Sequence, residues 1–223
     1  MAALAVMLSQ PLWGMDQYAG YEHFPYYWNA MTTPKGHFRV GLDLTPWDFQ
    51  CYGATGRNGF MFEPQVSASY GVCGRGDIGL DLNLSPGIGI YGEHEFMKGN
   101  IDLSAGGRSS YSWFNGFAAG RLEISPRVIA SNTENNKPFP WQANLGLSYN
   151  FIRYSYSSIP EVPSTGSTLG IVGGVGVPID LKLGTEKFKL QPEFGFHWRL
   201  AEKDAAYTPK FEGSLGAQLR YGF

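Results

Sequence analysis

The stretch FEGSLGAQLRYGF, residues 211–223, decides the fold of this chain. Its alternate positions carry apolar side chains, at Phe211, Leu215, Ala217, Leu219, Tyr221 and Phe223. The positions between them carry Glu212, Ser214, Gln218 and Arg220. Successive side chains of a β-strand point to opposite faces, so this alternation predicts a strand with one apolar and one polar face.

The same alternation recurs through the chain and predicts nine further strands. They lie within residues 37–45, 60–72, 77–84, 87–96, 101–113, 121–128, 141–151, 169–183 and 188–200. Segments of about ten residues are long enough to cross a bilayer when tilted, and an even strand number is typical of antiparallel membrane barrels. We therefore predict an all-β fold, a single antiparallel up-and-down transmembrane barrel of about ten strands, with eight or twelve as alternatives. Residues 50–59 are expected to form a long loop.

Composition is consistent with one barrel that faces something other than water. The chain has 223 residues, of which 16% are charged and 15% aromatic, and it contains 30 glycines. Soluble domains average about 25% charged residues. The net charge is −2 with no long basic run, so the electrostatic footprint of a nucleic-acid-binding protein is missing and we predict no nucleic-acid partner.

Alternation alone does not separate a membrane barrel from a soluble one, in which the apolar face points inward. Two features favour the membrane. The polar faces carry charges of both signs, as a narrow filled lumen would. Aromatic residues gather near strand ends, as interfacial girdles require: Trp47, Phe60, Tyr70, Phe96, Tyr111, Trp113, Trp141, Phe151, Phe188, Trp198, Tyr221 and Phe223. A soluble lipocalin-like barrel that binds an apolar ligand remains the alternative.

The last strand ends on Phe223, two residues after Tyr221, and this pattern resembles the C-terminal signature of bacterial outer-membrane β-barrels. The resemblance extends over residues 36–223 and points to the small outer-membrane β-barrel families. It implies localisation in the cell outer membrane of a Gram-negative bacterium and contact with outer-membrane lipid. It also implies insertion by the barrel-assembly machinery through the Phe223 strand, a monomer, and a structural or surface role.

The polar faces are expected to line the lumen. The predicted lumen-facing polar network comprises Arg39, Asp43, Glu63, Asp81, Glu93, Glu95, Arg108, Arg121, Glu123, Arg127, Glu193, His197, Arg199 and Arg220, and the same alternation adds Asp102, Lys189 and Glu212. Barrels of about eight strands are filled by side chains, whereas open channels occur at about sixteen. Opposed charges should therefore pair across the interior, because an unpaired buried charge is costly. A lining that selects small solutes in a narrow pore is the alternative.

No pattern in the sequence predicts catalysis. Glu93 and Glu95 share a face, but any alternating polar face produces such a pair. Outer-membrane lipid A deacylases carry a His directly before a Ser, and the nearest stretch, RYSYSS at 153–158, has no His, so a serine nucleophile would lack its base. The four His residues are scattered, so we predict no metal and no cofactor. An outer-membrane lipid-modifying enzyme is kept as an alternative function.

Prolines and cysteines constrain the strand registers. Pro64, Pro126, Pro178 and Pro192 lie inside strand runs, lack an N–H group, and are therefore expected at bulges near the rim. The two cysteines, residues 51 and 73, fall at opposite ends of a strand that would span about 25 Å. A disulfide needs Cα atoms within about 7 Å, so we predict none between them.

The N-terminal region divides into two parts. Residues 1–16 contain a short apolar stretch without a basic leader, which indicates a truncated signal segment. Residues 17–35 are rich in aromatics and have no period. They could plug the lumen, add a strand to the wall, or anchor at the membrane interface, and we predict the anchor because Tyr and Trp favour that boundary.

Overall fold

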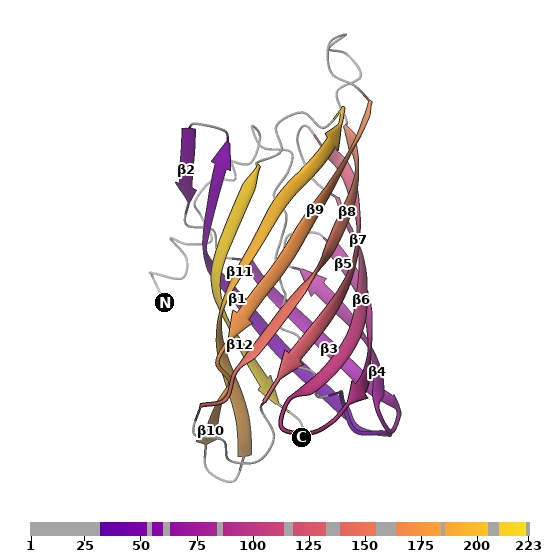
Figure 1. Cartoon of the computed structure of the whole chain (residues 1–223), viewed down its shortest axis with the longest axis vertical. Coiled ribbons are helices and arrows are strands. Elements are labelled where there is room, and N and C mark those ends of the chain that lie inside the picture. The colour runs from indigo at the N-terminus through magenta and orange to yellow at the C-terminus, as the bar shows by residue number, and fades with distance from the viewer. Residues whose placement is uncertain are drawn as a thin grey trace, which may run out of the picture.

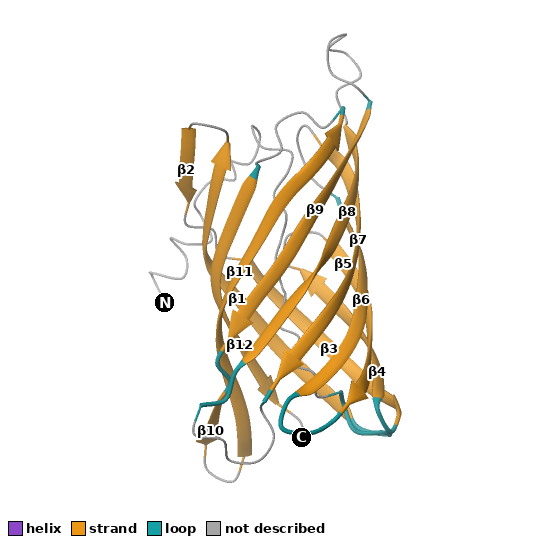
Figure 2. Cartoon of the chain, in the orientation of Figure 1, coloured by secondary structure: helices purple, strands orange, loops and turns teal. Residues whose placement is uncertain are grey.

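Every regular element in the described part of the chain is a β-strand (Figure 2). The computed structural model describes residues 32–52, 55–59, 63–83, 87–113, 118–132, 139–154, 164–183, 186–204 and 210–221. Within these ranges no helix is long and apolar enough to span a membrane. The strands are β1 (Phe38–Tyr52), β2 (Thr55–Gly59), β3 (Glu63–Cys73), β4 (Gly76–Asn83), β5 (Gly87–Met97), β6 (Asp102–Ser112), β7 (Ala118–Ser131), β8 (Gln142–Tyr154), β9 (Thr165–Gly176), β10 (Ile179–Leu183), β11 (Glu186–Lys203) and β12 (Phe211–Tyr221).

Ten of the described strands form a closed antiparallel ring (Figure 1). From β3 to β9 each strand pairs with the next in sequence, β9 pairs with β11, and β11 pairs with β12. The ring closes because β1 pairs with β3 on one side and with β12 on the other. Leu42, for example, lies opposite Val66 and also opposite Leu219. The predicted up-and-down barrel of about ten strands is confirmed.

Two short strands extend the ring at its opposite ends (Figure 1). At the upper end β2 pairs with the last residues of β1, so part of the loop predicted at 50–59 is instead a hairpin. At the lower end β10 pairs with the first residues of β11. The single strand predicted at 169–183 is therefore wrong, because the chain leaves the β9 ladder at Val177 and Pro178. Proline has no N–H with which to continue that ladder.

The prediction that prolines mark rim bulges holds only in part. Pro178 lies between two strands, and Pro192 sits where β11 changes partner from β10 to β9. Pro126 contradicts the prediction, because it lies inside β7 opposite Gly107 in an unbroken register. The neighbouring strand β8 passes so close that a Cβ on Gly146 would lie 2.1 Å from the carbonyl oxygen of Pro126. A glycine on β8 thus admits the proline without a bulge.

The surface is apolar and the interior is polar. Leu80 and Leu145 are 51% and 58% exposed, and many other large apolar side chains of the outer face are exposed too. Among the described residues the buried hydrophobic side chains are Ile129, Ile152 and Val172, whereas the buried polar and charged residues come from nearly every strand of the ring. A water-soluble barrel has the reverse distribution. The predicted assignment of faces is confirmed at these positions.

Aromatic side chains mark both ends of the apolar surface. Near the lower end Phe38 and Tyr70 lie on adjacent strands with ring centroids 4.7 Å apart. Near the upper end of β6, the rings of Tyr111 and Trp113 are 6.0 Å apart. Amphipathic rings favour the boundary between hydrocarbon and headgroups. Exposed aromatics therefore lie at both ends of the apolar surface, where interfacial girdles are expected.

The cysteines lie at opposite ends of the wall. Cys51 pairs with Phe211 near the upper end of β1, and Cys73 ends β3 at the lower rim with a free thiol. The predicted separation along the barrel is therefore present in the backbone, and it leaves no geometry for a bridge between them.

An arginine substitution on the outer face tests whether that face meets lipid or water. Leu147, on the outer face of β8, is 49% exposed. Changing Leu147→Arg should lower the free energy of unfolding by about 2–4 kcal/mol in phospholipid vesicles, because an arginine near the bilayer midplane is poorly solvated. Urea titration of the folded protein in vesicles measures this. Thr165→Arg, an exposed position at the upper end of β9, is the matched control and should change stability little. An equally mild effect of both changes would contradict a lipid-facing surface.

Candidate functional site in the barrel lumen

The inner wall gathers the charged residues of the predicted network. Those buried in the interior are Asp81, Glu95, Arg108, Arg121, Glu123, Arg127, Glu193 and His197. Arg39, Glu93 and Arg199 are half-buried. For Asp43, Glu63 and Arg220 the backbone lies in β1, β3 and β12, but their side chains lie outside the described ones. The wall therefore places most of the predicted residues around one interior.

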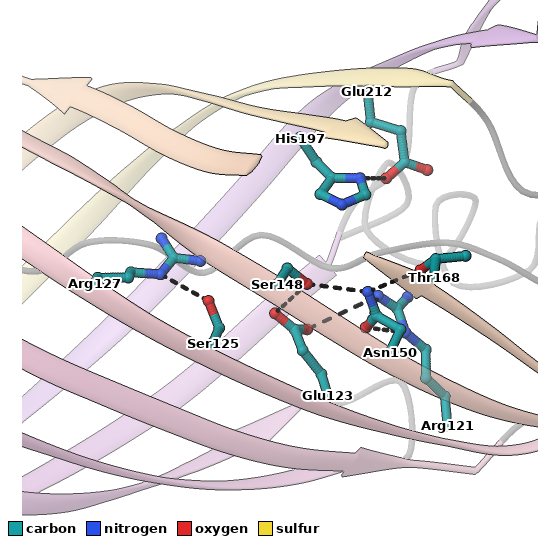
Figure 3. A network of polar contacts seen from close by, with 9 residues as sticks. All are labelled: Arg121, Glu123, Ser125, Arg127, Ser148, Asn150, Thr168, His197 and Glu212. Carbon is teal, nitrogen blue, oxygen red and sulfur yellow. Dashed lines mark hydrogen bonds and ion pairs between the residues drawn. The ribbon is translucent and has the colours of Figure 1, made fainter. Parts of the chain in front are cut away.

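One group of contacts joins β7, β8 and β9 (Figure 3). Arg121 donates to Asn150 Oδ1 from Nε at 2.9 Å and from Nη2 at 2.6 Å. Asn150 in turn donates to the hydroxyls of Ser148, at 3.0 Å, and Thr168, at 3.2 Å. Ser148 donates to Glu123 at 3.4 Å, and Arg121 Nη2 lies 3.9 Å from Glu123 Oε2. We call these five residues the upper network.

Two more strands contribute a buried imidazole and carboxylate. His197 of β11 lies with Nδ1 3.8 Å from Glu212 Oε2 of β12, and their side chains are 2% and 0% exposed (Figure 3). This distance exceeds that of a hydrogen bond, so the contact is an ion pair only when the imidazole is protonated. The imidazole of His197 lies across Gly170 of β9, where an added Cβ would be 2.1 Å from His197 Nε2. Close packing therefore holds the imidazole in place.

A second group of contacts lies lower in the barrel. Arg127 donates to Asn144 Oδ1 at 2.9 Å and to Ser125 Oγ at 3.1 Å. Glu193 Oε2 accepts hydrogen bonds from Gln142 at 2.9 Å and from Gln191 at 3.0 Å. These contacts bridge β7 to β8 and β8 to β11. We call these residues the lower network.

Polar contacts also join residues of the wall from β4 to β6. Arg108 Nε lies 2.8 Å from Asp81 Oδ2, and both side chains are buried. Ser104 donates a hydrogen bond to Glu93, and Gly99 N–H donates to Asp102 Oδ1 at 2.9 Å. Glu93 and Glu95, considered as a carboxylate pair, therefore lie on the inner wall, with Glu93 engaged by a serine.

The chemistry of this site is that of buried charged groups held by ion pairs and hydrogen bonds. Burying a charge is tolerated when an opposite charge or several hydrogen bonds accompany it. Asp81 supplies the opposite charge to Arg108, and side-chain hydrogen bonds hold Arg121, Arg127 and Glu193. Within the residues that the structure describes, no group of three or more His, Cys, Asp or Glu is placed to hold a metal ion.

Several participants were missing from the predicted network. Most of them, such as Ser148 and Asn150, are uncharged residues on the polar faces of predicted strands, whereas Thr168 and Asp77 lie just before or at a predicted strand start. Thr168 precedes the predicted strand start by one residue, and extending the alternation of Leu169 backwards would have placed it inside. Asp77 shares its face with Asp81 and accepts a hydrogen bond from the backbone of Thr33. Thr33 belongs to the segment 17–35, which was predicted to anchor at the interface. Its described end lies against the lumen wall instead, and residues 17–31 lie outside the described residues.

A closed antiparallel ring with an apolar outer belt and a charged interior defines the class of protein. Hydrocarbon offers no hydrogen-bond partners, so only such a ring can cross it with strands. The fold is that of a transmembrane β-barrel.

Comparison with known proteins finds fold likeness only. No family model matches the sequence, and no curated protein matches it. Among solved structures, the chain is similar to Neisserial surface protein A (15% identity, TM-score 0.39, covering 83% of this chain and 97% of that chain). It is also similar to the outer membrane protease OmpT from Escherichia coli (9% identity, TM-score 0.44, covering 84% of this chain and 97% of that chain). A third similar structure is the outer membrane protein OprG from Pseudomonas aeruginosa (10% identity, TM-score 0.32, covering 86% of this chain and 99% of that chain). At these scores the likeness adds nothing to the assignment of function, which rests on the side chains of this chain.

The upper network predicts a large stability cost for losing one arginine. Arg121→Leu removes two hydrogen bonds to Asn150 and the positive charge beside Glu123. The free energy of unfolding should fall by about 3–5 kcal/mol, as when one partner of a buried ion pair is removed. Arg153→Leu changes an exposed arginine on β8 and is the matched control. Its free energy of unfolding should stay within about 0.5 kcal/mol of that of the unmodified protein. Chemical denaturation in detergent micelles measures both, and equal effects would refute a stabilising network.

Proposed function

We propose that this chain is an integral barrel of the bacterial outer membrane with a structural or surface-exposed role, and that its lumen does not conduct solutes. Antiparallel single-chain barrels with an even strand number are the outer-membrane type, which supports the location. The observation that carries the second part is the hydrogen bonding between buried polar side chains of β7, β8, β9 and β11 along the inner wall.

The degree of burial argues against an open pore. Arg121, Arg127, Glu193 and Gln218 are all buried although their side chains end in charged or amide groups. In a water-filled channel such groups would be accessible to solvent. Barrels near eight strands are filled by side chains, whereas open aqueous channels occur at about sixteen. A ten-strand ring belongs with the filled barrels.

The same burial argues against catalysis inside the barrel. His197 and Glu212 are the described residues that most resemble a base oriented by a carboxylate, and both lie where a substrate has no access. A general base must come within hydrogen-bonding reach of the proton that it removes. The outer face of the described strands offers mainly apolar side chains to lipid. We therefore favour a non-catalytic role.

Two partners follow from this proposal. The apolar outer belt would contact outer-membrane lipid, and the strand ending in Phe223 would be recognised by the barrel-assembly machinery. The pairing of β12 with both β1 and β11 supports the second partner, because the strand that leads to Phe223 is also the one that closes the ring. A monomer suffices for both.

Conductance tests the sealed lumen. Folded protein, verified by heat-modifiable migration on a detergent gel, should give no unitary current steps in a planar bilayer, because polar side chains fill the interior. Arg127→Ala should raise the current across the bilayer, since it removes a buried guanidinium that bonds Asn144 of the adjacent strand on the inner wall. Arg153→Ala, on the outer face, should leave it unchanged. Reproducible current steps from the unmodified protein would show an open pore.

Removing Phe223 tests assembly and location together. The truncated protein should accumulate less in the outer-membrane fraction, in heat-modifiable form, because the assembly signal is lost. It should still refold into detergent micelles. Phe139→Ala, at an aromatic that is 82% exposed between β7 and β8, is the control. Full assembly without Phe223, or absence of the intact protein from the outer-membrane fraction, would count against the proposal.

A further inference from the structure

Immediately before β1 the chain makes a sharp reversal. His37 N–H donates to the carbonyl oxygen of Pro34 at 3.0 Å, and Gly36 has a φ of +80°. Residues 34–37 therefore form a type II turn, which has a hydrogen bond from the fourth residue to the first and a residue with positive φ, here Gly36, at the third position. We call residues 32–37 the strap. The turn directs the start of the strap back over the wall of the barrel.

The strap crosses the inner face of β3 at Gly71. Gly36 N–H donates to Gly71 O at 2.9 Å, Gly71 N–H donates to His37 O at 3.1 Å, and Lys35 forms a parallel bridge with Gly71. A Cβ on Gly71 would lie 2.1 Å from Pro34 O and 2.4 Å from Thr33 O. Only a residue without a side chain leaves room for the strap at this position.

Beyond Gly71 the strap reaches the next strand. Thr33 is 1% exposed, and its N–H donates to Asp77 Oδ2 of β4 at 2.6 Å. Its hydroxyl shares a 2.6 Å hydrogen bond with Ser69 of β3. Arg39 Nη2 donates to Thr32 O at 3.5 Å. Ser69, Gly71 and Asp77 are buried on the inner wall, so the strap covers that wall at the lower mouth of the lumen.

The strap lies outside the ladders of the ring and joins it through the backbone contacts at Gly71. The ring closes through β1 and β12, and none of its ladders includes residues 32–37. Residues 34–37 are exposed, and the strap buries no large apolar side chain against the wall. Segments held by a few hydrogen bonds with little apolar burial open locally at a lower free energy than the whole fold. The strap can therefore leave the wall while the barrel stays closed.

We propose that the strap is a detachable closure of the lower lumen mouth. In its bound state it shields Ser69 and Asp77 from water, and in its released state it exposes them without unfolding the barrel. The proposal concerns the described strap alone and does not depend on the role of the barrel in its membrane.

Cysteine labelling tests the closure. Ser69→Cys, in a background with Cys51→Ser and Cys73→Ser, places a single thiol beneath the strap. A membrane-impermeant maleimide should label this thiol slowly in the folded protein. Adding Gly71→Ala should raise the labelling rate roughly tenfold or more, because overpacking against two backbone oxygens disfavours the bound strap. Gly107→Ala is the matched control, since a Cβ there would meet nothing within 4 Å.

The outcomes are separable. Every variant is first shown to be folded by heat-modifiable migration. Fast labelling of Ser69→Cys without a second change, or equal slow labelling with Gly71→Ala and Gly107→Ala, overturns the proposal. If Gly71→Ala does not fold, Asp77→Ala, which removes the acceptor of Thr33 N–H, is compared with Asp77→Asn, whose amide oxygen still accepts it. Faster labelling with Asp77→Ala alone supports the closure, and equal rates overturn it.

Discussion

Pairing between the first and last strands of the wall is the interaction on which the rest of the structure depends. β1 lies against β12 from Val40 opposite Tyr221 to Cys51 opposite Phe211, with one irregularity between Leu44 and Trp47. Without this ladder two strand edges would expose N–H and C=O groups, and hydrocarbon cannot satisfy them. Closure therefore makes an apolar exterior possible, and it joins parts of the chain that are most distant in sequence.

Closure also determines what the interior must be. Once the apolar faces point outward, the opposite faces of all ten wall strands share one confined space, and most of these faces carry charged residues. The upper network around Arg121 and the lower network around Arg127 and Glu193 show how this space is filled, with guanidinium groups lying against amide oxygens and a carboxylate accepting from two amides. Such pairing is what makes buried charge tolerable. A filled interior fits a structural role better than solute passage.

Alternation predicted which side chains of the wall point outward and which point inward, because successive residues of a strand face opposite sides. Leu80 and Leu145 point outward, and Asp81 and Arg127 point inward, as their positions in the pattern require. The same pattern could not show where a ladder changes partner. The break at Pro178 follows from the change between the β9 ladders and the short hairpin of β10 with β11, which a period of two does not encode. The hairpin of β2 was missed because Thr55–Gly59 carries no apolar residue that could alternate. The contact of Thr33 with Asp77 was missed because no local period connects the two residues.

The central claim is that the outer face meets lipid and the inner face meets neither lipid nor bulk water. Spin labels at successive cysteines from Asn144 to Ser148 on β8, in the Cys51→Ser and Cys73→Ser background, test it most directly in vesicles. Paramagnetic relaxation should show labels at Leu145 and Leu147 accessible to oxygen dissolved in lipid but not to a water-soluble nickel complex, with labels at positions 144 and 148 shielded from both. Labels at 145 and 147 that respond to the nickel complex instead would contradict the account.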